Sequence, residues 1–336
     1  MILVTGGTGL VGSHVLLYLC QKHDKVRAIF RNESKIKKVK HVFEYYQESN
    51  MSFFDRIEWV QADIIDLPAL EKVFEGVEYV YHCAAMVSFD PSDYHALRKS
   101  NIEGTANIVN LCLNFGIKKI AYMSSVAALG GKDLNDPIRE DSPWNSDGDH
   151  NVYAITKYGA EMEIWRGVQE GLDCIIVNPG IIVGPGFWKS SSGSLFTRVF
   201  RGMRYYSTAI NGYVDIHDVV KTFIQLMESD ITNERFIQVA ENLSSKSFID
   251  MIAQAINAKS PEKSVSPLIL KFGWRYDWLR AKLLGKRRRL TRHLAKILTK
   301  DTYYDNSKLK KTLNFEYKPI SQSVEETAVL FNRDQA

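Results

Sequence analysis

The sequence predicts an α/β fold in which a doubly wound parallel sheet is joined to a smaller C-terminal lobe. Short apolar runs alternate with longer helical patterns over residues 1–178, at spacings that are typical of βαβ units. A glycine-rich turn directly follows the first of these runs. The composition, with 45% apolar and 24% charged residues, is that of a globular protein rather than a disordered or collagen-like chain.

Six apolar runs are the candidate strands of the sheet. In chain order they are ILVT, VRAIF, IEWVQ, YVYHC, IAYMSS and CIIVN. Folds of this kind bind their ligands at the carboxyl ends of the strands. The residues that follow each run are therefore where binding and chemistry are expected.

The turn after the first run, TGGTGLVG at residues 5–12, leads straight into a helical pattern. Gly6 permits the tight turn, Gly9 lets the backbone approach a pyrophosphate, and Gly12 lets helix and strand pack closely. The start of the helix adds N–H groups and the positive end of its dipole. A purely structural glycine turn is the alternative, but the strand, turn and helix together predict a Rossmann-type dinucleotide site.

The end of the second run indicates which dinucleotide is bound. An NAD site usually carries an acid here, whereas VRAIFRN offers Arg31. The guanidinium fork of an arginine pairs bidentately with the oxygens of a 2′-phosphate. Lys35, Lys37 and Lys38 add positive charge, although a solvated helix face explains these lysines equally well. The sequence favours NADP(H) and leaves NAD(H) open.

A tyrosine and a lysine stand four residues apart in a later helical pattern, NVYAITKYGAEMEIW. This spacing places Tyr153 and Lys157 on one face of the helix, where an ammonium can lower the phenol pKa from its reference value of about 10. The pattern alone recurs by chance. It gains weight from Ser125, which follows a candidate strand and is placed to hold a carbonyl oxygen. Ser124 is the competing serine.

Length and composition bound the remaining organisation. At 336 residues the chain suits a nucleotide-binding domain over residues 1–178 and a mainly C-terminal substrate lobe over residues 179–336, with some elements interleaved. A polar loop at residues 133–150 is long enough to be a lid. The four cysteines stand singly, so disulfides and metal sites are not expected, and a reducing, cytoplasmic location fits best.

Six ordered motifs together resemble the extended short-chain dehydrogenase/reductase family, also called the NAD-dependent epimerase/dehydratase family. They are TGGTGLVG, HCAA at 82–85, NIEGT at 101–105, SSVAALG at 124–130, YAITK at 153–157 and NPGIIVGPG at 178–186. The resemblance covers essentially the whole chain. VRAIFRNESKIKKVK and SSVAALG are more similar to the dihydroflavonol 4-reductase and 3β-hydroxysteroid dehydrogenase branch than to sugar-nucleotide epimerases.

The resemblance implies roles for the matching positions. Ser125, Tyr153 and Lys157 would be catalytic, and Asn101 would help to order the active site. His82 matches a family histidine, and a structural role is favoured for it. The cofactor would contact Leu10 and Val11 at the pyrophosphate, Asp63 and Ile64 at the adenine, Ala84 and Ala85 alongside, and Pro179, Ile181 and Ile182 at the nicotinamide. Tyr153 and Lys157 would also contact the cofactor, and Lys157 would hold the nicotinamide ribose.

The expected reaction is the interconversion of a carbonyl and an alcohol on a small organic substrate by hydride transfer with NADP(H). Val126 and Ala127 stand where family dehydratases carry an acidic pair, so dehydration is not expected. A nucleotide-sugar epimerase with retained NAD is one alternative. A non-catalytic, cofactor-sensing binding protein is the other, and the intact Ser-Tyr-Lys set opposes it. Family members commonly dimerise, so a homodimer is left open.

Two features of the C-terminal lobe allow more than one interpretation. Trp188, Phe196, Tyr205 and Tyr206 would either line an apolar pocket or pack in a core. The segment 268–300 mixes aromatic residues with cations, and residues 271–300 contain eleven Lys/Arg and one acid. We favour a helix whose apolar stripe packs on the substrate lobe; weak contact with an anionic membrane is the minority hypothesis. Nucleic acid is not expected as a partner.

Overall fold

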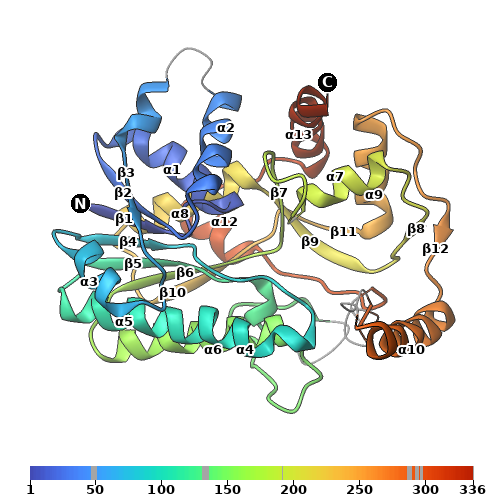
Figure 1. The fold of residues 1–336 in the computed structure, drawn as a ribbon, viewed down its shortest axis with the longest axis horizontal. Coiled ribbons are helices and arrows are strands. Elements are labelled where there is room, and N and C mark those ends of the chain that lie inside the picture. Colours follow the sequence, from blue (N-terminus) through green and yellow to red (C-terminus); the bar gives the residue numbers. More distant parts are fainter. Residues whose placement is uncertain are drawn as a thin grey trace.

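The computed structural model describes residues 1–46, 51–130, 136–190, 192–285, 290–291, 295 and 298–335. Its main sheet has seven parallel strands in the order β10-β6-β5-β4-β1-β2-β3, with helices on both faces (Figure 1). The predicted doubly wound α/β fold is confirmed. The strands are β1 (Ile2–Thr5), β2 (Val26–Phe30), β3 (Ile57–Gln61), β4 (Tyr79–His82), β5 (Lys119–Met123), β6 (Cys174–Pro179) and β10 (Glu234–Gln238).

Alternation along the strands divides the core into two layers. Leu3 packs into one layer and Val4 into the other, because successive strand side chains point to opposite faces. The layer of Val4 is covered by α1 (Leu10–Lys22), α2 (Ile36–Tyr46), α8 (Ile216–Glu228) and α12 (Ser307–Leu313). The layer of Leu3 is covered by α3 (Leu67–Phe74), α5 (Gly104–Asn114) and α6 (Val152–Gln169).

Short helical turns connect several of these elements. They are η1 (Glu33–Lys35), η2 (Met51–Arg56), η3 (Pro91–Asp93), α4 (Tyr94–Leu97), the π-helical turn η4 (Arg98–Glu103) and η5 (Val126–Ala128).

The switch in strand order places a crevice beside β1. The chain runs from β1 to β2 and β3 on one side, and then returns to build β4, β5 and β6 on the other. The segments after β1 and β4 meet at this point, where the Cys83 amide donates a 3.1 Å hydrogen bond to the Thr5 carbonyl. Ligands bind in such crevices because the diverging connections leave the strand ends uncovered.

The seventh strand comes from beyond the predicted nucleotide-binding segment. β10 pairs in parallel with β6, from Glu234 opposite Ile175 to Gln238 opposite Pro179. No strand is predicted from the sequence in this stretch. Its side chains Phe236 and Ile237 are fully buried, so the sheet needs this C-terminal contribution to close its core.

A second, smaller layer lies beside the main sheet and is formed by residues after 179 (Figure 1). Its core includes Trp188 and Phe196, whose rings contact each other and the ring of Phe331. The pocket interpretation is therefore wrong for these two residues. The elements are β7 (Ile181–Val183), α7 (Gly193–Phe200), β8 (Tyr205–Tyr206), β9 (Ile210–Asp215), β11 (Glu241–Ser244), α9 (Ser245–Ala255), β12 (Lys263–Ser264), α10 (Pro267–Leu284) and α13 (Ile320–Gln335).

The apolar stripe of α10 differs from expectation. Leu270 and Asp277 are buried against the protein, whereas Phe272, Tyr276 and Leu283 on another side are 69 to 72% exposed. The favoured interpretation, in which the stripe packs on the lobe, is therefore wrong for this helix. Residues 286–289, 292–294 and 296–297 of the basic segment lie outside the described residues. No helix in the described ranges has the length and apolar character needed to cross a membrane.

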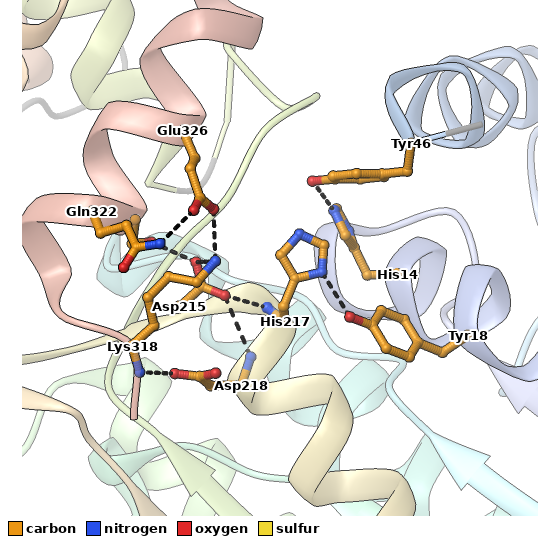
Figure 2. A network of polar contacts seen from close by, with 10 residues as sticks. His14, Tyr18, Tyr46, Asp215, His217, Asp218, Lys318, Gln322 and Glu326 are labelled. Atoms are coloured by element: carbon orange, nitrogen blue, oxygen red, sulfur yellow. Dashed lines mark hydrogen bonds and ion pairs between the residues drawn. The ribbon is translucent and has the colours of Figure 1, made fainter. Parts of the chain in front are cut away.

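Two histidines join α1, the helix after the glycine turn, to α2 and α8 (Figure 2). His14 Nε2 lies 3.4 Å from the Tyr46 hydroxyl, and His217 Nδ1 lies 3.1 Å from the hydroxyl of Tyr18. The two imidazoles meet edge to face with centroids 5.7 Å apart. This contact fixes α1 against the beginning of α8.

The same network reaches the C-terminal helix through the N-cap of α8. Asp215 accepts hydrogen bonds from the backbone amides of His217 and Asp218 and from the hydroxyl of Ser323 in α13. Lys318 lies 3.7 Å from the Asp215 carboxylate and pairs with Glu326 (Figure 2). The layer of α1, α2 and α8 and the C-terminal helix are thus held by one set of polar contacts.

The buried His14 gives folding stability a defined pH dependence. Burial first, and then the nearby His217, lower the pKa of His14 from 6.5 to about 3. The unfolded chain takes up this proton near pH 6.5 but the folded chain only near pH 3, so stability falls as the pH drops through that window. Between pH 8 and pH 5.5, His14 should remove about 1 kcal/mol from the free energy of unfolding.

Urea denaturation of the wild type and of His14→Gln at both pH values measures this contribution. The wild type should lose about 1 kcal/mol more than the variant over the interval. The comparison cancels other groups, such as Asp218, whose pKa burial raises to about 6 and which acts in the opposite direction. Equal losses in both proteins would contradict a neutral, buried His14.

Candidate active site

A cleft opens at the carboxyl ends of β1, β2, β3 and β4, at the switch in strand order. Each of these four strands contributes the residues that follow it. The walls are formed by Gly6, Thr8, Gly9, Ile29, Phe30, Arg31, Lys35, Ala62, Asp63, Ile64, Cys83, Ala84, Ala85 and Ser100. The cleft therefore brings together Gly6, Gly9, Arg31, Asp63, Ile64, Ala84 and Ala85, which the sequence analysis places around a dinucleotide.

The glycine turn forms the floor of this cleft and leaves no room for side chains at two positions. Gly6 has φ of +69°, and a Cβ there would lie 2.6 Å from the backbone of Cys83 and Ala84. A Cβ on Gly12 would lie 2.2 Å from the Gly6 carbonyl oxygen. Both distances are shorter than real Cβ contacts, so the turn requires glycine at Gly6 and Gly12.

Gly9 differs, because a Cβ there would meet only the Gly6 oxygen at 3.4 Å and would otherwise point into open space. Gly9 is the N-cap of α1, and no side chain caps the N–H groups of the first turn, which carries no acid. Unpaired amides at a helix start, next to a surface stripped of side chains, fit a phosphate group. The cradle therefore suits the pyrophosphate of a dinucleotide.

Arg31 and Asp63 face each other across the mouth of the cleft. The guanidinium Nη1 lies 3.6 Å from Asp63 Oδ2, and the Arg31 side chain is 61% exposed. Lys35 lines the same wall. Two cations and one acid at this mouth leave net positive charge where the second strand ends, which suits an anionic group more than a neutral one.

Other residues expected at the cofactor lie beyond these walls. Leu10 and Val11 begin α1, and their side chains pack into the core rather than lining the cleft. Pro179 ends β6, while Ile181 and Ile182 belong to β7 and pair with β9. The chain passes at these three residues from the main sheet to the smaller layer.

Ser125 and Tyr153 come together at the end of β5. The Tyr153 phenol, on the first turn of α6, shares a hydrogen bond with Ser125 that lowers its pKa, while burial raises the pKa by more. Asn151 caps α6 by accepting from the Ala154 amide at 2.8 Å. The phenol is therefore held protonated beside a serine hydroxyl, which suits a proton donor.

Lys157 is buried, and its hydrogen bonds go to the end of β5. Its Nζ donates to the Tyr122 hydroxyl at 2.7 Å and to the Met123 carbonyl at 2.9 Å. Burial lowers the pKa of Lys157 to about 7, and the Glu161 carboxylate partly opposes this. The phenol that bonds to the ammonium is therefore that of Tyr122 rather than that of Tyr153.

A chain of buried polar groups leads from the glycine turn to this lysine. Thr5 Oγ1 lies 2.6 Å from His82 Nδ1, and His82 Nε2 lies 3.0 Å from Thr105 Oγ1. Thr105 in turn shares a hydrogen bond with the Tyr122 hydroxyl, whose pKa burial raises. Burial also lowers the pKa of His82 to about 3, so its imidazole is neutral at physiological pH and fits a structural role.

Asn101 connects the segment after β4 to the helix that carries Tyr153. Its Oδ1 accepts from the Met86 amide at 2.7 Å, and its Nδ2 donates to the Met86 carbonyl and to Thr156 Oγ1. Asn101 is buried within the π-helical turn η4. These bonds hold the wall of the cleft against α6 rather than reaching into the cleft.

Glu161 lies one helical turn beyond Lys157 and is fully buried. It accepts from Ser124 Oγ at 2.7 Å, from Asn178 Nδ2 at 3.0 Å and from Arg235 Nη1 at 2.8 Å. Ser124 is thus turned away from Ser125 into this network. Sequence reasoning missed Glu161 and Tyr122; the spacing of Glu161 from Lys157 was the one available signal, since residues four apart share a helix face.

Comparison with known proteins agrees with this geometry. A model of the NAD dependent epimerase/dehydratase family matches residues 2–240. A Synechocystis sp. protein with a provisional assignment as a dihydroflavonol 4-reductase is 29% identical over 331 residues, which cover 96% of this chain and 91% of that protein. The dihydroflavonol 4-reductase of Callistephus chinensis is 28% identical and covers 79% of this chain and 74% of its own.

One solved structure is similar along its whole length. The crystal structure of gox2253 has 27% sequence identity and a TM-score of 0.82, and covers 99% of this chain and 98% of its own. The fold is therefore shared with this solved protein over nearly the whole of both chains.

Proposed function

Because the chain belongs to the NAD dependent epimerase/dehydratase family and is an NAD(P)-dependent enzyme with reductase relatives, we propose that it is an NADP(H)-dependent oxidoreductase. It would interconvert a carbonyl and an alcohol on a small organic substrate. The observation that carries the proposal is the hydrogen bond between Ser125 and the Tyr153 phenol at the end of β5, the strand next to β4, whose following residues line the cleft.

Four side chains divide the chemistry between them. When bound, the nicotinamide supplies or accepts the hydride. Ser125 Oγ donates a hydrogen bond to the substrate oxygen and so orients the carbonyl. Tyr153 donates its phenolic proton to that oxygen as charge develops on it. The Lys157 ammonium, which is bonded to Tyr122 rather than to Tyr153, stabilises the phenolate left behind through its charge. Asn101 keeps the wall of the cleft in register with α6.

The cofactor would lie along the switch point of the sheet. The glycine cradle, with the amides of Leu10 and Val11, would hold the pyrophosphate, and Asp63 and Ile64 would lie at the adenine. Ala84 and Ala85 would lie beside the cofactor, and Lys157 would hold the hydroxyls of the nicotinamide ribose. Pro179, Ile181 and Ile182 would lie against the nicotinamide. We propose residues 1–178 as the nucleotide-binding domain and residues 179–336 as mainly the substrate lobe.

The preference for NADP(H) rests on Arg31 at the end of β2, opposite Asp63. Arg31→Ala should raise the KM for NADPH about 10- to 100-fold, because a charge-assisted bond to the 2′-phosphate is lost. The KM for NADH, which lacks this phosphate, should change less than threefold. Steady-state kinetics with both cofactors measures the split, and equal losses would remove the basis for an NADP(H) preference.

A cofactor titration followed by a carbonyl and alcohol screen tests the function as a whole. The protein should bind NADPH, and at least one carbonyl compound should be reduced with an equal amount of NADPH consumed. An epimerase would instead turn over a nucleotide sugar with its cofactor retained and no net consumption. A cofactor-binding protein inert towards the entire panel would contradict any enzymatic role.

A further inference from the structure

The outer side of α10 carries an apolar stripe that stays exposed in the folded protein. Ile269, Phe272, Tyr276, Leu279 and Leu283 are between 47% and 72% exposed. Figure 1 shows α10 at the periphery of the molecule, apart from the helices that cover the main sheet. Exposed aromatic and aliphatic side chains gathered on one helix are unusual on a protein surface that faces only water.

The spacing of these residues defines one face of the helix. They follow each other at intervals of three and four residues, which places them in a single row along the axis. Leu270 and Asp277, on another side, are buried against the protein. The helix has defined ends, since Ser266 Oγ accepts from the Ile269 amide at 3.2 Å and Gly285 ends it with φ of +60°. The stripe is therefore one continuous face of a helix with defined ends.

Cations border the stripe. Arg275 and Lys282 are exposed on α10, with the Arg275 guanidinium 4.5 Å from the ring of Trp274 and the Lys282 ammonium 5.3 Å from the ring of Trp278. The one acid of this stretch, Asp277, is buried and paired with Arg280 at 2.7 Å. Over residues 271–300 the sequence has eleven Lys/Arg against this single acid. The described surface of α10 is thus apolar and bordered by cations, within a segment whose sequence is strongly basic.

We propose that α10 docks on an anionic lipid bilayer, with the stripe among the outer acyl chains and the cations at the lipid headgroups. Interfacial helices combine an apolar face with flanking Lys and Arg, and their aromatic residues lie at headgroup depth. Anionic lipid complements the net charge of this segment. A second copy of the chain fits poorly, because it would bring the same positive charge to the same face.

Flotation with vesicles tests this docking. The full-length wild type should float with phosphatidylcholine vesicles that contain about one quarter phosphatidylglycerol, and much less with phosphatidylcholine alone. The charge-neutral variant Arg275→Gln/Lys282→Gln should lose about fivefold in partition for each cation removed. The stripe variant Phe272→Ser/Leu279→Ser/Leu283→Ser should lose at least tenfold in partition. It lacks three apolar groups that the bilayer would bury.

A matched control changes exposed apolar residues elsewhere. Phe200→Ser/Val329→Ser alters side chains that are 51% and 68% exposed on α7 and α13 and should float like the wild type. NADPH binding and circular dichroism check that each variant is folded. The proposal is overturned if the wild type floats with neither vesicle, or if the stripe variant floats as well as the control. It is also overturned if the wild type forms a dimer and binds no lipid, and if the stripe variant is a monomer.

Discussion

Replacing Tyr153 with phenylalanine should lower kcat for carbonyl reduction by a factor of about 10² to 10⁴, the range that general acid catalysis contributes. The variant keeps the ring and its edge contact with Phe89, whose centroid lies 5.6 Å away, and loses only the hydroxyl that meets Ser125. The KM for NADPH should therefore change little. The measurement is steady-state kinetics on the best substrate of the carbonyl screen.

Tyr158→Phe is the matched control for this change. Tyr158 lies on the same helix, but its ring stacks on Trp144 with centroids 4.3 Å apart, outside the cleft. Its loss of a hydroxyl should alter kcat less than twofold. If Tyr153→Phe kept full turnover, the phenol would not be the acid and the proposed mechanism would be wrong.

Lys157→Met should lower kcat/KM for NADPH by about 10² to 10³, because the substitution removes both a ribose contact and the charge that stabilises the Tyr153 phenolate. The change keeps the length and apolar stem of the side chain. It leaves the Tyr122 hydroxyl and the Met123 carbonyl without their donor. Lys311→Met, at an exposed position on α12, is the control and should behave like the wild type.

The pH profile separates a charge role from a packing role for Lys157. Burial lowers the pKa of Lys157 to about 7, so the free enzyme loses this positive charge as the pH rises above 7. The wild-type kcat/KM for NADPH, which reports ionisations of the free enzyme, should fall over that range. Lys157→Met should show no such limb. A variant that lost activity but kept the wild-type profile would contradict the charge role.

Much of the fold follows from local patterns. The strands β1 to β6 appear in the sequence as apolar runs, because strands buried on both faces carry few polar residues. The sequence does not predict β10, because the polar residues Glu234, Arg235 and Gln238 interrupt its apolar pattern. Only Phe236 and Ile237 indicate a buried strand. Its place in the sheet depends on pairing with β6, across more than fifty intervening residues.

In the candidate site, too, local features can be predicted from the sequence and long-range contacts cannot. The positions of Ser125 and Tyr153 follow from the ends of a strand and the start of a helix, which are local features. The hydrogen bond from Lys157 to Tyr122 could not be predicted, because nothing in the sequence distinguishes Tyr122 from other aromatic residues of a buried strand. The pairing of Glu161 with Arg235 joins residues that only the sheet brings together.

The outer face of α10 shows that apolar spacing alone does not predict which side of a helix is buried. Apolar residues at helical spacing predict a buried stripe in most proteins, because the hydrophobic effect favours burial. Here the buried side is formed by Leu270 and Asp277, and the row from Ile269 to Leu283 remains outside. Which side of the helix packs inward is decided by the surrounding lobe, which the helix sequence does not encode.

The most direct test of the account is a deuterium-transfer measurement. The protein is incubated with a panel of ketones and aldehydes and with NADPH deuterated at the transferable position of the nicotinamide, and the alcohol product is analysed by mass spectrometry. The account predicts one deuterium on the former carbonyl carbon, one NADP⁺ formed for each alcohol, and almost no product with Tyr153→Phe. Binding of NADPH without transfer to any member of the panel would contradict it.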